Sequence, residues 1–301
     1  MIDVGGPVHV LEWTGVEGPT FVCVHGLGGS HTNWLSLAPL LATRGRVLVI
    51  DLIGFGRTPL GERTASVQSN VKLVEAFLEV EVAGPAILLG NSMGGYISMS
   101  VASASPELVS GLVLVDPAIA RTGGQAVDRT VAALFATYMI PKVGERFVEA
   151  RVRKLGPERV MRDTLALCCV DPSRVPQSVI DAQLALAHER FESMPWATTA
   201  FLQAARSLLG QLARRARFDA MVREISAPAL LVMGTHDRLV PIAAARRLAS
   251  LRPDWDFVEF GHLGHVPQME DAPAVFAAIE TWLDGPAARA LGSVRAAEET
   301  R

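Results

Sequence analysis

The sequence predicts an α/β fold with a mainly parallel sheet and an inserted helical cap. Short apolar, β-branched runs bounded by Gly, Pro or Asp alternate with helical patterns, which is typical of βαβ units. This alternation stops between Asp116 and Pro228, where helical periodicity takes over. Connections within a compact α/β unit are normally about two to six residues long, so this interval must hold structure of its own.

The core elements follow from these runs. Six core strands are expected at residues 20–24, 46–50, 86–90, 111–115, 229–233 and 256–260, after an edge strand near residues 8–13. The helices between them are expected to include residues 67–79, 94–104 and 242–251.

The predicted domain boundaries divide the chain into a core of residues 1–118 and 227–284, a helical cap of residues 119–226 and a tail of residues 285–301. Helical patterns in the cap cover residues 144–154, 157–169 and 179–193. The tail lacks a sustained apolar face, so we expect it to be frayed. The cap supplies apolar side chains for packing and for a substrate pocket: Leu184, Leu186, Phe191, Phe201, Leu202, Leu208 and Leu209.

Composition narrows the class of protein. Half of the 301 residues are hydrophobic and 20% are charged, which indicates a globular chain. The 28 basic and 31 acidic residues are spread along the chain, so no nucleic-acid partner is expected. No stretch is apolar enough for integral membrane association, and the first residues do not form a secretory leader. Three cysteines do not make a disulfide framework, so a cytoplasmic protein is expected. The oligomeric state stays open, a homodimer included.

Ser92 is the predicted nucleophile. A buried run, residues 86–89, precedes it and a helical pattern begins at Met93, so Ser92 falls on a strand-to-helix turn. Gly90 and Gly94, two residues to either side, permit a tight turn without side-chain clashes. A serine that only caps a helix is the alternative, but the strand-then-helix context favours the nucleophile.

A second glycine-rich turn, His25-Gly26-Leu27-Gly28-Gly29, follows the first core strand. Its backbone can bring an N–H group toward a carbonyl under attack, so Leu27 and Met93 are the predicted oxyanion-hole donors. Gly26 and Asn91, beside them, are predicted to contact the substrate. The spacing of a dinucleotide-binding loop is absent, and an ordinary glycine turn is the alternative.

The general base must be one of seven histidines. His265 is the leading candidate, because a few residues after the last strand allow its side chain to swing toward the nucleophile, and Gly264 gives flexibility. His262 is the alternative. His25 is expected to fix the oxyanion loop through hydrogen bonds.

Asp237 is the predicted acid that orients the histidine. It follows a core strand, lies between the serine and the histidine in sequence, and ends a Gly-x-x-Asp turn at residues 234–237, which favours it. Asp116 satisfies the same order and is the rival. Asp51 precedes the serine and is expected to organise a turn.

These motifs together resemble the α/β-hydrolase superfamily, over roughly residues 8–284. The resemblance covers the oxyanion loop at residues 25–29, the turn at residues 51–56, the nucleophile elbow at residues 90–95, the acid loop at residues 234–241 and the histidine loop at residues 264–267. It implies a Ser-His-Asp hydrolase of the esterase or lipase type, with a helical cap.

The resemblance also separates reaction classes within the superfamily. Haloalkane dehalogenases and epoxide hydrolases place an aspartate where Ser92 stands, so these activities are disfavoured. Asn91 before the serine also resembles the meta-cleavage product hydrolases, which break carbon–carbon bonds. Those enzymes typically carry a tryptophan after the histidine, where this chain has Val266.

The leading prediction is therefore a carboxylic-ester hydrolase that acts on a hydrophobic small molecule or acyl chain through an acyl-enzyme. A carbon–carbon bond hydrolase is the first alternative, and a ligand-binding protein or receptor on the same scaffold is the second. The His and Asp residues lack metal-site spacing and a triad needs no cofactor, so no metal or cofactor is expected.

Overall fold

A seven-stranded sheet forms the centre of the molecule in the computed structural model, which describes residues 1–121 and 128–285. The strand order is β3-β5-β4-β6-β7-β8-β9, with β3 antiparallel to β5 and the other neighbours parallel. The strands are β3 (Val10–Trp13), β4 (Thr20–Val24), β5 (Arg46–Ile50), β6 (Ala86–Asn91), β7 (Val109–Val115), β8 (Ala229–Gly234) and β9 (Asp256–Phe260). The predicted fold class is confirmed.

The six predicted core strands are all present, and their ends differ from the prediction by no more than a short extension. The predicted edge strand at residues 8–13 is divided in two. β1 (Ile2–Asp3) pairs with β2 (Pro7–Val8) in a small separate sheet, and β3 begins at Val10. The predicted strand is divided because its two halves pair with different strands: β2 pairs with β1, and β3 pairs with β5.

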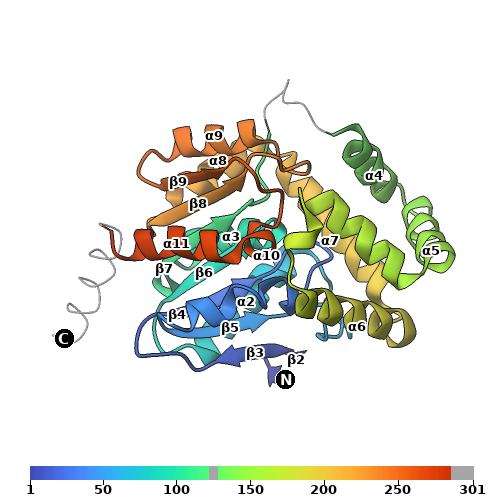
Figure 1. The fold of residues 1–301 in the computed structure, drawn as a ribbon, viewed down its shortest axis with the longest axis horizontal. Coiled ribbons are helices and arrows are strands. Elements are labelled where there is room, and N and C mark those ends of the chain that lie inside the picture. The colour runs from blue at the N-terminus through green and yellow to red at the C-terminus, as the bar shows by residue number, and fades with distance from the viewer. Residues whose placement is uncertain (122–127, 286–301) are drawn as a thin grey trace.

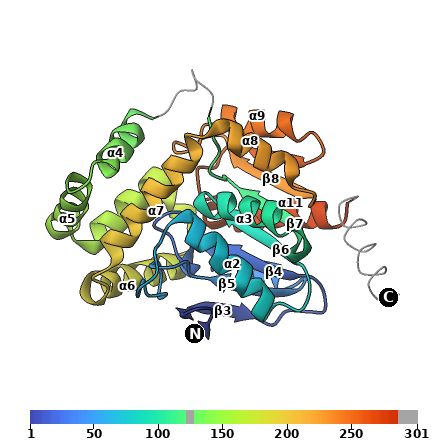
Figure 2. The same cartoon turned by 180° about the vertical axis from the view of Figure 1, so that it is seen from behind.

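Both faces of the sheet are buried, which is why its strands are nearly continuous apolar runs. In β6, Ala86 and Leu88 point to one face while Ile87 and Leu89 point to the other. The first face packs against α2 (Val67–Glu81), α3 (Met93–Ala104), α8 (Arg215–Glu224) and α9 (Ile242–Leu251). The second packs against η1 (His31–Trp34), α1 (Ala38–Leu41) and α11 (Ala272–Leu283). Figure 1 shows α11 in front of the sheet, and Figure 2 shows α2 and α3 on the opposite side.

The segment between β7 and β8 is helical, as the sequence predicted. It contains α4 (Arg129–Met139), α5 (Val143–Cys168), η3 (Pro172–Arg174), α6 (Gln177–Ser193) and α7 (Ala197–Leu212). These elements form a separate layer beside the sheet in both views (Figure 1, Figure 2). Two helices predicted at residues 144–154 and 157–169 are joined in α5 by a kink, where Gly156 has φ of 78° and Pro157 follows.

The segment after α7 returns to the core before residue 226, the predicted end of the cap. Phe218 of α8 stacks on Tyr96 of α3, with ring centroids 6.0 Å apart. We call the layer formed by α4 to α7 the cap, and the predicted bounds of the cap at residues 119 and 226 stay a prediction. The predicted tail lies outside the described residues from residue 286 onward. Within the described part of the chain, no helix combines the length and apolar character that a membrane span requires.

Candidate active site

Ser92 occupies the turn between β6 and α3, as its neighbours predict. Its backbone has φ of 54° and ψ of −116°, a conformation that costs a non-glycine residue about 1–3 kcal/mol. The close packing of the turn demands glycine on both sides. A Cβ atom on Gly94 would lie 2.1 Å from the Val24 carbonyl oxygen, and one on Gly90 would lie 2.5 Å from the Gly94 oxygen. The strained turn presents the Ser92 side chain at the carboxyl end of the central strand.

Backbone hydrogen bonds hold this turn on both sides. The Ser92 carbonyl accepts from Tyr96 N (3.1 Å) and from Ala118 N (2.8 Å). The Ser92 N–H donates to the Val115 carbonyl at 3.2 Å. The strained conformation is thus fixed by the following helix and by the end of β7, which is how a strained backbone persists in a folded protein.

The predicted oxyanion loop lies directly against this turn. A Cβ atom on Gly26 would lie 3.0 Å from the Ser92 Cβ, which is tighter than most Cβ contacts, so glycine favours this close approach of the loop. Leu27 is the next residue of that loop. Met93 is the first residue of α3, where a backbone N–H has no acceptor within the helix. Both predicted donors therefore belong to segments that border Ser92, and their role stays a prediction.

His25 fixes the oxyanion loop, as expected. Its Nδ1–H donates to the Gly26 carbonyl (2.8 Å), and its Nε2 accepts from Leu52 N (3.0 Å). This pattern requires a neutral ring with one donor and one acceptor nitrogen. The ring is fully buried, and burial lowers the pKa of His25 to about 4. His25 therefore stays neutral and structural near pH 7.

His265 and Asp237 form a close pair. His265 Nδ1 lies 2.6 Å from Asp237 Oδ2, and because a carboxylate can only accept, Nδ1 carries the proton. The other carboxylate oxygen accepts from Leu239 N (2.7 Å) and Val240 N (3.0 Å). The pair is buried, and the proton on Nδ1 leaves the His265 Nε2 lone pair free to act as a base.

The rival acid Asp116 lies beside this pair, since one of its carboxylate oxygens comes within 4.8 Å of an Asp237 carboxylate oxygen and of a ring nitrogen of His265. Asp116 is completely buried and accepts from Gly234 N at 3.0 Å. Burial, followed by the negative charge of Asp237, raises the pKa of Asp116 well above its usual range. The direct partner of His265 is thus Asp237, with Asp116 beside it in an environment that favours the protonated form.

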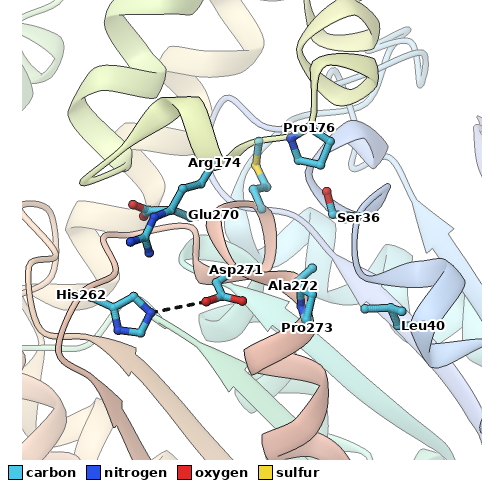
Figure 3. Close-up of a pocket in the computed structure, with 10 residues that line it drawn as sticks. Ser36, Leu40, Arg174, Pro176, His262, Glu270, Asp271, Ala272 and Pro273 are labelled. Carbon is cyan, nitrogen blue, oxygen red and sulfur yellow. Dashed lines mark hydrogen bonds and ion pairs between the residues drawn. The ribbon is translucent and has the colours of Figure 1, made fainter.

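The alternative base, His262, lies elsewhere. Its side chain is half exposed and its Nε2 is 3.4 Å from Asp271 Oδ2. It lines an open surface groove of about 690 Å³ together with Arg174 and Pro176 (Figure 3). Apart from this alternative base, the groove is lined by none of the predicted site residues, so its size does not make it the active site.

Asn91 ties the nucleophile turn to the histidine loop. Its Nδ2 donates to the carbonyls of His265 and Val115, at 3.0 Å each. Asn91 is buried, and its amide hydrogens are used by the backbone. These contacts give Asn91 a positioning role, while its predicted contact with substrate, like that of Gly26, stays a prediction.

Glu270, in α10 (Pro267–Glu270), joins the cap to the histidine loop. This buried carboxylate accepts from Gly264 N (3.0 Å) and from Asp171 N in the cap (2.7 Å). The His265 N–H also donates to Cys168 O, at the end of α5, at 2.6 Å. Sequence analysis missed Glu270, because a partner so distant in sequence leaves no local pattern.

Two cap side chains reach the oxyanion loop. The ring of Phe201 in α7 would be 3.3 Å from a Cβ on Gly28, and Arg190 of α6 donates from Nη1 to the Gly28 carbonyl at 3.5 Å. Burial lowers the pKa of Arg190, with Asp51 opposing the shift. The cap therefore brings both an aromatic ring and a guanidinium to the site, which periodicity alone could not locate.

One further cluster has the residue types of a metal site, although the sequence spacing gave no such indication. The Nδ1 atoms of His9 and His31 both lie 2.8 Å from Asp51 Oδ2. Asp51 also accepts from His31 N (2.6 Å) and Arg57 N (2.9 Å). These are hydrogen-bonding distances, and they fit the predicted role of Asp51 as the organiser of a turn.

Comparison with known proteins gives the family of this chain. Residues 21–279 match the model of the "Alpha/beta hydrolase family". The chain belongs to this family. The hydrolase is similar, at 31% identity over 91% of its length, to the dihydrolipoyllysine-residue acetyltransferase component of the acetoin cleaving system of Pseudomonas putida, and it spans 66% of that protein.

Two further likenesses cover nearly whole chains. The 2-hydroxy-6-oxononadienedioate/2-hydroxy-6-oxononatrienedioate hydrolase of Cupriavidus pinatubonensis is 27% identical, over 87% of this chain and 85% of its own. A thermophilic esterase from Thermogutta terrifontis has a similar structure, with a TM-score of 0.69, 23% identity and 92% of each chain covered. The latter likeness concerns the fold alone.

Proposed function

We propose that this hydrolase cleaves a carboxylic ester of a hydrophobic small molecule or acyl chain through an acyl-enzyme. Ser92 is the nucleophile, His265 the general base and Asp237 the acid that orients the imidazole. The observation that carries the proposal is the 2.6 Å contact between His265 Nδ1 and Asp237 Oδ2, which leaves Nε2 as the basic nitrogen.

The reaction follows from these positions. His265 Nε2 takes the proton of the Ser92 hydroxyl while the oxygen attacks the ester carbonyl carbon. The N–H groups of Leu27 and Met93 stabilise the resulting oxyanion. Collapse of the tetrahedral intermediate expels the alcohol, which receives the proton from His265. Water, deprotonated by the same nitrogen, then releases the acid and frees Ser92.

The cap side chains that reach the oxyanion loop support a hydrophobic substrate. Phe201 supplies apolar surface beside Gly28, while Arg190 supplies a positive charge at the same loop. Ligand pockets are typically apolar, with a small number of polar groups that orient the ligand. An aromatic ring beside one guanidinium group fits that description.

A carbon–carbon bond hydrolase is the second candidate. Asn91 directly precedes Ser92, and the Cupriavidus relative is named as a 2-hydroxy-6-oxononadienedioate/2-hydroxy-6-oxononatrienedioate hydrolase. Against this candidate stands Val266, at the position where such enzymes typically carry a tryptophan. The ester reaction is therefore preferred.

Covalent labelling tests the catalytic proposal. A fluorophosphonate probe should add to the wild-type protein at Ser92, as read by intact mass and peptide mapping. Ser92→Ala should abolish the label, and His265→Ala should slow it strongly. If the wild type does not react, or if Ser92→Ala labels as fast, the proposal is wrong.

Substrate assays separate the two candidates. We expect turnover of p-nitrophenyl esters, compared over increasing acyl length, and little turnover of a vinylogous 1,5-diketone. Efficient cleavage of the diketone alone would instead establish the carbon–carbon reaction.

A further inference from the structure

Exposed apolar side chains gather at one end of the cap. Four apolar side chains in one short stretch at the α4–α5 turn are exposed: Met139 (43%), Ile140 (52%), Val143 (48%) and Phe147 (37%). We call these four residues the cap tip. α4 and α5 lie at the outer side of the cap in both views, away from the sheet (Figure 1, Figure 2). Exposed apolar residues that cluster in this way mark an interaction surface.

Positive charges border the cap tip. Lys142 and Arg146 are exposed beside its apolar residues, and Arg153 and Lys154 are exposed farther along α5. No carboxylate within the described parts of the chain forms an ion pair with any of these four cations. Val143 and Phe147 are four residues apart, so they share one helix face, with Arg146 next to it. An apolar stripe edged by cations is typical of helices that lie in a membrane interface.

The cap tip is held rigidly from inside. Arg206 of α7 donates to the carbonyl of Tyr138 (2.9 Å, from Nε) and to that of Ile140 (3.4 Å, from Nη2). Its guanidinium also pairs with Glu145 at 2.7 Å. Two backbone carbonyls of the turn, those of Tyr138 and Ile140, are thus satisfied within the protein, which favours entry into a less polar phase. Arg206 thus neutralises Glu145, and the exposed carboxylate Glu149 between Arg146 and Arg153 is outnumbered by the four cations.

An aromatic series connects the cap tip with the active site. The ring centroids of Phe147 and Tyr138 are 6.2 Å apart, and those of Tyr138 and Phe201 are 5.1 Å apart. Phe201 then borders the oxyanion loop at Gly28. The exposed apolar surface is therefore continuous in packing with the residues that border the predicted nucleophile.

We propose that the cap tip is a docking surface for an anionic lipid bilayer. Its apolar side chains would enter the headgroup region while Lys142 and Arg146 meet the lipid phosphates. A second copy of the chain fits this surface less well, because a two-fold contact would set the four cations of each copy against one exposed carboxylate of this stretch, Glu149. The inference does not depend on the proposed reaction.

Vesicle flotation tests the inference. The wild-type protein should float with vesicles of phosphatidylcholine and phosphatidylglycerol at low salt, and far less with phosphatidylcholine alone. Ile140→Ser combined with Phe147→Ser should weaken the partition on the order of tenfold or more. Lys142→Gln combined with Arg146→Gln should weaken it by about fivefold for each cation removed.

Matched controls change the same residue types elsewhere on the surface. Val80→Ser and Arg223→Gln remove an exposed apolar side chain and an exposed cation of the core, and both should leave flotation unchanged. All sites are exposed, so circular dichroism should show unaltered folding. The inference is overturned if the wild type floats with neither vesicle, or if both double variants float like the wild type. It is equally overturned if size-exclusion light scattering shows a dimer that Ile140→Ser and Phe147→Ser convert to a monomer, since the surface would then join two copies.

Discussion

Replacement of Glu270 by alanine tests how far the cap supports the histidine loop. The substitution removes the acceptor of two backbone N–H groups, those of Gly264 and Asp171, at a site where Glu270 is only 3% exposed. A hydrogen bond to a charged group contributes about 1.5–3 kcal/mol, and a buried donor left unpaired costs a comparable amount. Some relaxation and entry of water will offset part of this loss. We therefore expect Glu270→Ala to lower the free energy of unfolding by about 4 kcal/mol.

Turnover should fall as well, because His265 follows Gly264 directly. A displacement of a catalytic group by about 1 Å can reduce the rate on the order of a hundredfold. Urea unfolding followed by circular dichroism measures the first effect, and the rate of fluorophosphonate labelling under folding conditions measures the second. Hydrogen exchange should rise in residues 261–266 and in residues 168–172.

Two companion variants make the result specific. Glu270→Gln keeps the size of the side chain but retains one acceptor oxygen, so its losses should be intermediate. Asp171→Ala keeps the backbone N–H that donates to Glu270 and should label at nearly the wild-type rate. The reasoning is refuted if Glu270→Ala unfolds within about 1 kcal/mol of the wild type and labels within twofold of its rate.

Three other substitutions give further expected outcomes. Asp237→Asn should slow turnover by about 10⁴-fold, because the partner that fixes the His265 tautomer is lost, and a loss below tenfold would instead favour Asp116 as the acid. The folded pKa of His25 is about 4, below its ordinary value of 6.5, so its stabilising effect is complete above that ordinary value and is lost as the pH falls toward 4, by about 3 kcal/mol. Denaturation at several pH values should therefore show the stability gap between wild type and His25→Gln narrowing in acid, and a constant gap would contradict this. Gly94→Ala should destabilise the fold by about 3 kcal/mol or more, since its Cβ would meet the Val24 carbonyl at 2.1 Å, and an unchanged melting temperature would show that the turn can relax.

The core could be predicted from the sequence because its signals are local. The apolar run at residues 86–89 and the glycines around Ser92 specify a buried strand and a tight turn without reference to distant residues. The strand ends were placed less well at residues 8–13, where pairing with β1 or with β5 decides the assignment. Pairing partners are not encoded in a run of residues, so this choice belonged to the tertiary structure.

The site residues divide in the same way. By itself the sequence determined the fold class and selected Ser92, Asp237 and His265 as candidates, because each follows a strand that ends at the same edge of a parallel sheet. Only the tertiary structure decided that Asp237 pairs directly with His265 while Asp116 lies buried beside it. It likewise decided that Glu270 binds both the cap and the histidine loop, since hydrogen bonds between residues 99 positions apart depend on how the helices of the cap pack and not on any local pattern.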